Sequence, residues 1–225
     1  SSVKPRFLAA IAVDVSRSMG LDPRDPYRET PDPTKIHDAR KLLIFYNELF
    51  ARISKVFGYI RSANYTFSDT VTKIKGFDQD YDSPKRYEYE GGIQSTVKVR
   101  LMEQVRTQAG TDILEAVQTI GKELNQQTFE YPDYASAFYF VGDGEDSYQH
   151  EPKIREFLEN ANPENGFGEH MVSAVMLGDE ALRQHLATLF GDEHTTVADN
   201  FDGLIERSMA KFDDDIEEYL AGKTM

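Results

Sequence analysis

The stretch Asp14-Val15-Ser16-Arg17-Ser18 directly follows an apolar run over residues 7–13. Such a continuous apolar run is typical of a central strand in a parallel sheet, which is buried on both faces. The run stops at a carboxylate, and two hydroxyls follow at two-residue spacing. Oxygen atoms of Asp, Ser and Thr are ligands that suit Mg²⁺ or Ca²⁺. The stretch therefore predicts a buried strand that ends at a site for a divalent cation.

Two later stretches offer further oxygen ligands. Thr111, within Gly-Thr-Asp at 110–112, opens a helical pattern, and Asp143, within Val-Gly-Asp-Gly at 141–144, closes a second apolar run. In an open parallel sheet, ligands bind outside the carboxyl ends of the strands. We therefore expect both residues to meet the 14–18 stretch at one edge of the sheet.

Helical and strand-like patterns alternate along the chain, which favours an α/β fold. Strands are predicted at 6–13, 59–67, 71–75, 135–141, 171–177 and 194–197, and helices at 34–57, 112–124, 152–160, 180–190 and 203–220. A length of 225 residues suits one full-sized domain. We expect a single domain over 1–225, with insertions at about 21–33 and 76–92, excised from a longer chain because it begins with Ser rather than Met.

Some segments allow less definite predictions. Residues 21–33 are rich in Pro, Asp and Arg, which predicts a loop. After about Ser95 a helix is favoured, although a hairpin around Gly91-Gly92 is the alternative. Aromatic residues within 76–92 fit either a cover for the core or a second contact surface, at the end of the sheet opposite the cation site. The acidic end of the last helix, 213–218, is expected to face solvent.

The composition narrows the class of partner. A formal charge of −14 argues against nucleic-acid binding, which depends on Lys and Arg. The sequence has no cysteine, which removes disulfides, zinc–thiolate sites and thiol nucleophiles and fits a cytoplasmic protein. No apolar run approaches the roughly 20 residues that cross a bilayer, so no membrane partner is expected.

With its three motifs in this order, the chain resembles the von Willebrand factor A (vWA) domain. The metal-ion-dependent adhesion site (MIDAS) of that family is written D-x-S-x-S, then T, then D. The resemblance implies a three-layer Rossmann-like sandwich: a six-stranded, mostly parallel sheet with one antiparallel edge strand and helices on both faces. It also implies a metal centre that holds Mg²⁺, or Mn²⁺ or Ca²⁺. The implied metal residues are Asp14, Ser16, Ser18, Thr111 and Asp143.

The resemblance also implies a role for each of these residues. Ser16 and Ser18 would coordinate the metal through their hydroxyls, Thr111 directly or through water, and both Asp residues mostly through bound waters. Neutral hydroxyls leave the charge of the cation poorly cancelled, so an Asp or Glu of a partner protein can fill an open position. We therefore expect a non-enzymatic protein–protein interaction module. Intracellular members of the family that this chain resembles often work in larger machines, as chelatase subunits or partners of AAA+ ATPases, so the resemblance implies that the module is part of such an intracellular assembly.

Two other functions stay open at this point. One is a Mg²⁺-dependent phosphohydrolase that uses Asp14 and Asp143, although no Lys or His lies in these motifs to assist a leaving group. The other is a metal-silent structural vWA domain, in which the 21–33 segment lends Asp22 or Asp25 as an internal ligand.

Neighbouring polar residues are assigned to structural roles. Asp112 is expected to cap the helix that it precedes. Glu145 and Asp146 are expected to be solvated loop charges. Gly142 departs from the family pattern, because a hydroxyl residue often precedes the last Asp of the motif.

Overall fold

The computed structural model describes residues 6–22, 25–29, 35–56, 58–89, 91–144, 150–178, 183–198 and 201–222. Its centre is a six-stranded sheet in the order β10-β9-β8-β1-β4-β5. The strands are β1 (Arg6–Asp14), β4 (Tyr59–Phe67), β5 (Val71–Lys75), β8 (Ala135–Gly142), β9 (Met171–Leu177) and β10 (Thr195–Ala198). All neighbouring pairs are parallel except β4 and β5. The predicted sheet, with its one antiparallel edge strand, is confirmed.

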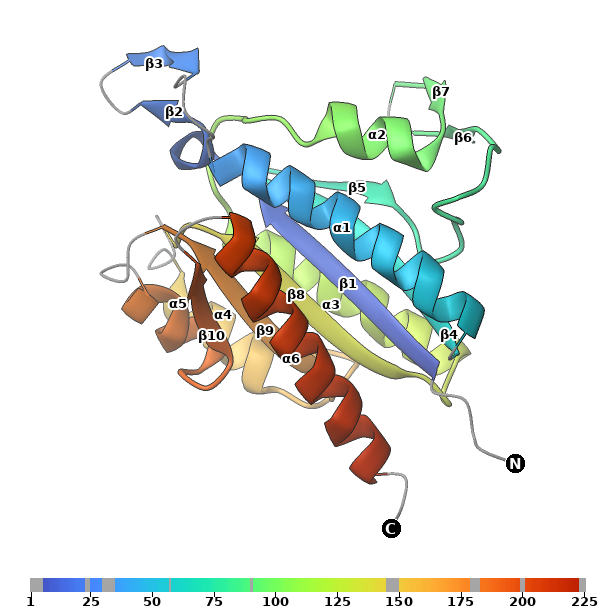
Figure 1. Ribbon diagram of the computed structural model, residues 1–225. Helices are drawn as coiled ribbons and strands as arrows, with labels where there is room; N and C mark the ends of the chain where they lie inside the picture. Colours follow the sequence, from blue (N-terminus) through green and yellow to red (C-terminus); the bar gives the residue numbers. More distant parts are fainter. Residues whose placement is uncertain are drawn as a thin grey trace.

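Helices cover both faces of this sheet (Figure 1). They are α1 (Lys35–Val56), α2 (Val97–Gln104), α3 (Ile113–Glu130), α4 (Glu151–Glu159), α5 (Arg183–Phe190) and α6 (Phe201–Gly222). Apolar residues of α1, α2 and α6 form one core with the sheet, and those of α3, α4 and α5 form the other. The fold is the predicted three-layer α/β sandwich.

The β1 strand shows why its sequence is apolar without interruption. Phe7, Ile11 and Val13 lie in the core beneath α1 and α6, whereas Leu8 and Ala10 lie in the core beneath α3. Successive side chains of a strand point to opposite faces, so both faces of β1 are buried. Each fully buried Leu, Ile or Phe contributes roughly 1.5–3 kcal/mol. This buried strand fixes the position of Asp14 at its carboxyl end.

The composition of the 21–33 segment predicts a loop, but the structure shows a short pair of strands within it. β2 (Leu21–Asp22) and β3 (Asp25–Glu29) form a small antiparallel pair beside the short 3-10 helix Arg17–Met19. Composition indicates turns, but it does not exclude backbone pairing between short segments on either side of a turn. The expected helix start at 32–34 lies outside the described residues.

Both readings of the segment around Gly91-Gly92 are correct. β6 (Tyr87–Glu88) and β7 (Gln94–Ser95) form a hairpin whose turn holds both glycines at positive φ. Helix α2 then starts after Thr96, whose Oγ1 accepts the Val99 N–H at 3.4 Å.

The aromatic residues of 76–92 mainly cover the core. Phe77 and Tyr81 are buried, and the Tyr81 hydroxyl donates to Glu48 Oε1 at 2.9 Å. Tyr87 packs against the core beneath α1.

The expectation that the acidic end of α6 faces solvent was wrong for Asp215. Its side chain is buried, and its Oδ2 accepts a hydrogen bond from the Tyr139 hydroxyl at 2.7 Å. Asp213 and Asp214 are exposed, as expected. The helical spacing puts Asp215 on the same face as Phe212, which packs against the sheet. Burial of a carboxylate requires a donor such as the Tyr139 hydroxyl, and the sequence does not reveal that pairing.

Candidate metal centre

The centre begins where β1 ends. Asp14 is buried, and its Oδ1 accepts the backbone N–H of Ser16 at 2.7 Å. The N–H of Val15 still donates to the Phe67 carbonyl at 3.0 Å, so the chain leaves the sheet only after this residue. The Asp14 carboxylate thus fixes the turn that carries the serines.

The two serine hydroxyls lie together. Ser16 Oγ and Ser18 Oγ are 2.9 Å apart, on a turn of 3-10 helix that follows the strand. The side chain of Met19 is buried in the core beneath α1, which anchors the turn. Two hydroxyls within hydrogen-bonding distance of each other can also direct oxygen lone pairs at a common cation.

Asp143 reaches the same place from β8. Val13 pairs with Val141 in parallel register, so the residues after each strand lie side by side. A Cβ atom at Gly142 would lie 3.1 Å from Cβ of Asp14 and 2.9 Å from Cε1 of Phe140. This close approach explains why glycine, and not a hydroxyl residue, precedes Asp143 here.

Asp143 also contacts a cation of the protein itself. Lys35 Nζ, at the start of α1, lies 2.9 Å from Asp143 Oδ2. Asp143 is fully buried, whereas about a third of the Lys35 side chain (32%) is exposed. Sequence reasoning missed Lys35. The available signal was that a helix on a parallel sheet begins at the edge where the preceding parallel strand ends.

The charge of Asp143 acts on Asp14. Burial, followed by the negative charge of Asp143, raises the pKa of Asp14 to about 7. The hydrogen bonds from Ser16 and the positive charge of Lys35 act in the opposite direction. A divalent cation bound beside these two buried carboxylates would stabilise their charged forms.

Thr111 lies on a segment that is bonded to both neighbouring turns. The Gln108 N–H donates to the Val15 carbonyl at 2.6 Å, and the Asp112 N–H donates to the Ser68 carbonyl at 2.7 Å. The Thr111 side chain is half-buried. The structure thus brings the Thr111 segment to the edge that carries Asp14.

The structural role expected of Asp112 is confirmed. Its Oδ1 accepts the Glu115 N–H at 2.9 Å, so Asp112 caps α3. Two residues earlier, Gly110 has φ 78°, and a side chain there would overlap the carboxylate of Asp69. Glycine is therefore required at this position.

The residues present fit a hard cation. They offer hydroxyl and carboxylate oxygens, which suit Mg²⁺, Mn²⁺ or Ca²⁺. Among the described residues, no group of three or more His, Cys, Asp or Glu side chains is placed to hold a metal ion. A centre here would therefore depend on its hydroxyls. The side chains of Asp22 and Asp25, and residues Glu145 and Asp146, lie outside the described residues.

No protein-family model matches this sequence, and a comparison with curated protein sequences finds no relative. Solved structures with the same architecture do exist. Conserved hypothetical protein BatB from Bacteroides thetaiotaomicron matches with a TM-score of 0.55 at 14% identity, over 94% of this chain and 99% of that chain. The fold is vWA-like.

Two further solved structures are similar to this vWA-like chain. The PilB minor pilin from Streptococcus sanguinis has a TM-score of 0.55 at 13% identity, over 98% of this chain and 63% of that one. Proximal thread matrix protein 1 from the mussel byssus, with a zinc-occupied MIDAS motif, has a TM-score of 0.50 at 15% identity, over 90% of this chain and 44% of that one. At such low identity the likeness concerns the fold alone.

Within the described part of the chain, no helix combines the length and the apolar character needed to span a bilayer.

Proposed function

We propose that this vWA-like domain is a metal-dependent protein–protein interaction module, which binds an Asp or Glu of a partner protein. The observation that carries the proposal is the meeting of the Ser16 and Ser18 hydroxyls with two buried carboxylates at one edge of the sheet. Ser16, Ser18 and Thr111 would hold the metal through their hydroxyls, and Asp14 and Asp143 would support it from the buried side. The bound cation would supply a positive charge that attracts a carboxylate.

The protein's own residues prepare this centre in three ways. Asp14 fixes the serine turn through the Ser16 N–H, so the hydroxyls are held in place before any ligand arrives. Because Asp14 and Asp143 are buried, their carboxylates would not occupy the solvent-facing position of the metal that a partner would fill. The half-buried Ser18 and Thr111 lie nearer to that side, where a partner can approach.

The setting is also part of the proposal. The resemblance to intracellular vWA domains supports a cytoplasmic place within a larger assembly, with an AAA+ ATPase as one candidate partner. The vWA-like neighbour with a zinc-occupied MIDAS motif supports use of a metal on this fold.

The proposal is tested with a variant that removes both hydroxyls, Ser16→Ala/Ser18→Ala. These hydroxyls bond to each other, so their joint removal leaves neither alone. Asp14 loses the hydrogen bond from the Ser16 side chain but keeps the one from the Ser16 N–H, so the fold should tolerate the change. We expect isothermal titration with MgCl₂ or MnCl₂ to show binding by the native chain and at least tenfold weaker binding by the variant. The matched control is Ser83→Ala, whose hydroxyl accepts the Lys85 N–H in the distant 76–92 segment.

The second stage uses the same proteins on beads, with Mg²⁺ or with EDTA. A partner of the proposed kind is captured only with Mg²⁺ and only by proteins that keep both serines, and excess free glutamate lowers the capture. Undiminished capture in EDTA, or by the double variant, would refute metal-mediated binding.

A phosphohydrolase remains a second candidate because of one observation. The motifs lacked a Lys, but the structure brings Lys35 to within 2.9 Å of Asp143. Against it, Asp14 and Asp143 are almost entirely buried, so neither carboxylate can approach a phosphate ester directly. Mg²⁺-dependent turnover of p-nitrophenyl phosphate that disappears in Asp14→Asn would favour the enzyme, and no turnover would exclude this substrate class.

A further inference from the structure

The sheet has an incomplete edge at the start of β9. On one side, β9 pairs with β8 from Met171 onward, but on the other side β10 pairs with it only from Ala174. The Ala174 N–H donates to the His194 carbonyl at 2.8 Å, which is the first bond of that ladder. The first residues of β9 therefore form an edge that β10 does not cover.

The hydrogen bonds show where the ladder ends. A continued parallel ladder would have the His194 N–H donate to the Val172 carbonyl. Instead, the His194 N–H donates to the Gly191 carbonyl at 3.3 Å, within the turn that precedes β10. Since backbone groups alternate in direction along a strand, the N–H and C=O of Val172 point to the same side as those of Ala174. Within the part of the chain that the structure describes, Val172 thus offers a donor and an acceptor at the open edge.

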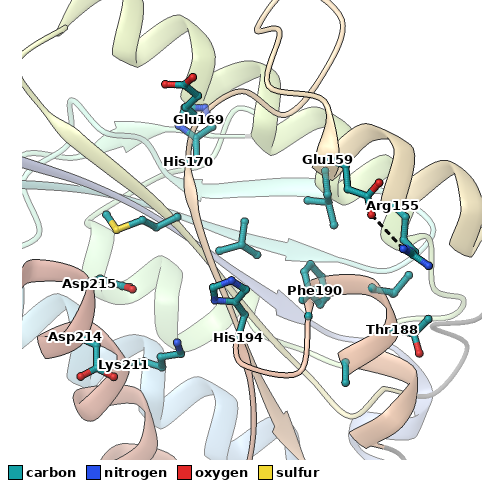
Figure 2. A pocket seen from close by; sticks show the side chains of 16 residues that line it. Arg155, Glu159, Glu169, His170, Thr188, Phe190, His194, Lys211, Asp214 and Asp215 are labelled. Atoms are coloured by element: carbon teal, nitrogen blue, oxygen red, sulfur yellow. Dashed lines mark hydrogen bonds and ion pairs between the residues drawn. The ribbon is translucent and has the colours of Figure 1, made fainter. Parts of the chain in front are cut away.

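This edge lies in a cleft of about 780 Å³. Figure 2 shows the cleft from close by, with the side chains of α6 on one side of His194 and those of α4 and α5 on the other. The residues that line it include Glu169, Met171, Val172, Phe190, His194 and Asp215. The cleft is bordered by α4, α5 and α6, and the first residues of β9 run along it. Such a cleft suits a partner segment in extended conformation.

The charges in the cleft are mainly acidic. Besides His170 and His194, the ionisable residues that line it are the basic Arg155 and Lys211 and the acidic Glu159, Glu169, Asp214 and Asp215. Arg155 and Glu159 pair with each other at 3.1 Å, and the buried Asp215 accepts the Tyr139 hydroxyl. Apart from Glu159, the exposed acidic residues of the lining are therefore Glu169 and Asp214, and Lys211 is the other basic residue beside them. The nearby His170 adds no positive charge near neutral pH, because burial lowers its pKa to about 4.

We propose that this cleft receives an extended, basic segment of a partner protein. The backbone of that segment pairs with Val172 as an added strand in line with β10, and its Lys or Arg side chains approach Asp214 and Glu169. Unpaired strand edges are ready templates for such pairing, and charges beside the edge select against neutral or acidic strands. The site lies at the amino end of β9, opposite the candidate metal centre, and does not depend on the proposed function.

The probe for a first test is the peptide acetyl-Lys-Val-Thr-Val-Lys-amide, added in EDTA so that the metal centre plays no part. Because the open edge is short, we expect a Kd on the order of 1 mM. We expect NMR titration to shift the amide signals of 171–173 and of the 211–215 turn of α6, and hydrogen exchange at the Val172 amide to slow. No saturable shift at 171–173 would overturn the proposal.

Two controls separate backbone pairing from charge attraction. A peptide with N-methylated backbone amides keeps every side chain but loses its donors, and we expect it to bind at least tenfold more weakly. The same loss is expected for acetyl-Glu-Val-Thr-Val-Glu-amide. Equal binding of either peptide contradicts an added basic strand.

The chain offers a matched pair of variants. Asp214→Lys reverses a charge that lines the cleft, whereas Asp213→Lys makes the same change at the preceding exposed residue, which does not line it. We expect at least threefold weaker peptide binding for Asp214→Lys and no change for Asp213→Lys. Equal effects of the two variants would show that net charge alone, and not the cleft, attracts the peptide.

Discussion

Replacement of Lys35 by Met should tighten the binding of Mg²⁺ to the candidate centre. Lys35 Nζ lies 2.9 Å from Asp143 Oδ2, so the protein's own cation engages a carboxylate that a divalent ion would use. A divalent ion must therefore compete with this ammonium group or tolerate its charge. Removal of the ammonium removes that competition.

The size of the effect follows from the contact. A hydrogen bond to a charged group contributes about 1.5–3 kcal/mol net. Because 32% of the Lys35 side chain is exposed, solvent screens the pair and the lower part of this range applies. A change of about 1.5–2 kcal/mol corresponds to roughly 13- to 30-fold tighter binding.

Isothermal titration with MgCl₂ and MnCl₂ measures this change. The matched control is Lys41→Met on the same helix, which removes a more exposed pair with Asp38 at 3.3 Å and should leave the affinity unchanged. Without metal, Lys35→Met should be less stable than the native chain, by about 1–3 kcal/mol, because Asp143 loses a charged donor while buried. Added Mg²⁺ should restore that stability by mass action.

Two results would refute this reasoning. Unchanged affinity in Lys35→Met would show that Lys35 and the cation do not share Asp143. Weaker binding would show that Lys35 holds the carboxylate in the position that the metal requires.

Three further predictions concern stability. Burial lowers the pKa of Lys75 from 10.5 to about 7, so between pH 7 and pH 10 the unfolded chain binds a proton that the folded chain lacks. The free energy of unfolding, measured by urea titration, should therefore rise from pH 7 to pH 10. Lys75→Met should flatten this rise. Gly142→Ser should lower stability by about 1–3 kcal/mol, because its Cβ would lie 2.9 Å from the Phe140 ring; an unchanged melting temperature would show that the ring can withdraw. Asp112→Ala should cost about 1 kcal/mol through loss of the α3 cap while Mg²⁺ affinity stays the same, and a lost affinity would instead assign Asp112 to the metal.

The sheet could be predicted because its strands are dictated by local pattern. β1 is apolar on both faces, and the predicted bounds of β4, β5 and β9 agree with the structure. Such patterns report burial directly, since successive residues of a strand alternate between faces. The small β2–β3 pair was missed because it rests on backbone hydrogen bonds, which place few demands on side-chain type.

The sequence predicted that Asp14 and Asp143 lie at one edge of the sheet, but it did not predict the ion pair that Asp143 forms there. Parallel strands that end at Asp14 and Asp143 must bring these residues to one edge. The contact of Lys35 with Asp143 joins residues 108 positions apart and depends on where α1 starts. Likewise, the burial of Asp215 depends on Tyr139 across the core. Such pairings between single polar side chains leave no periodic signal in a sequence.

The segment that carries Thr111 is hydrogen-bonded to the turns that follow β1 and β4. The Gln108 N–H donates to the Val15 carbonyl, and Gln108 Oε1 accepts the Ser68 hydroxyl at 2.9 Å. The Asp112 N–H donates to the Ser68 carbonyl. These three turns therefore cannot shift separately, since displacement of one strains bonds to the others. A partner that binds at this edge, as proposed, would meet a surface whose shape is already fixed by folding, so little of the binding free energy would be lost to ordering the chain.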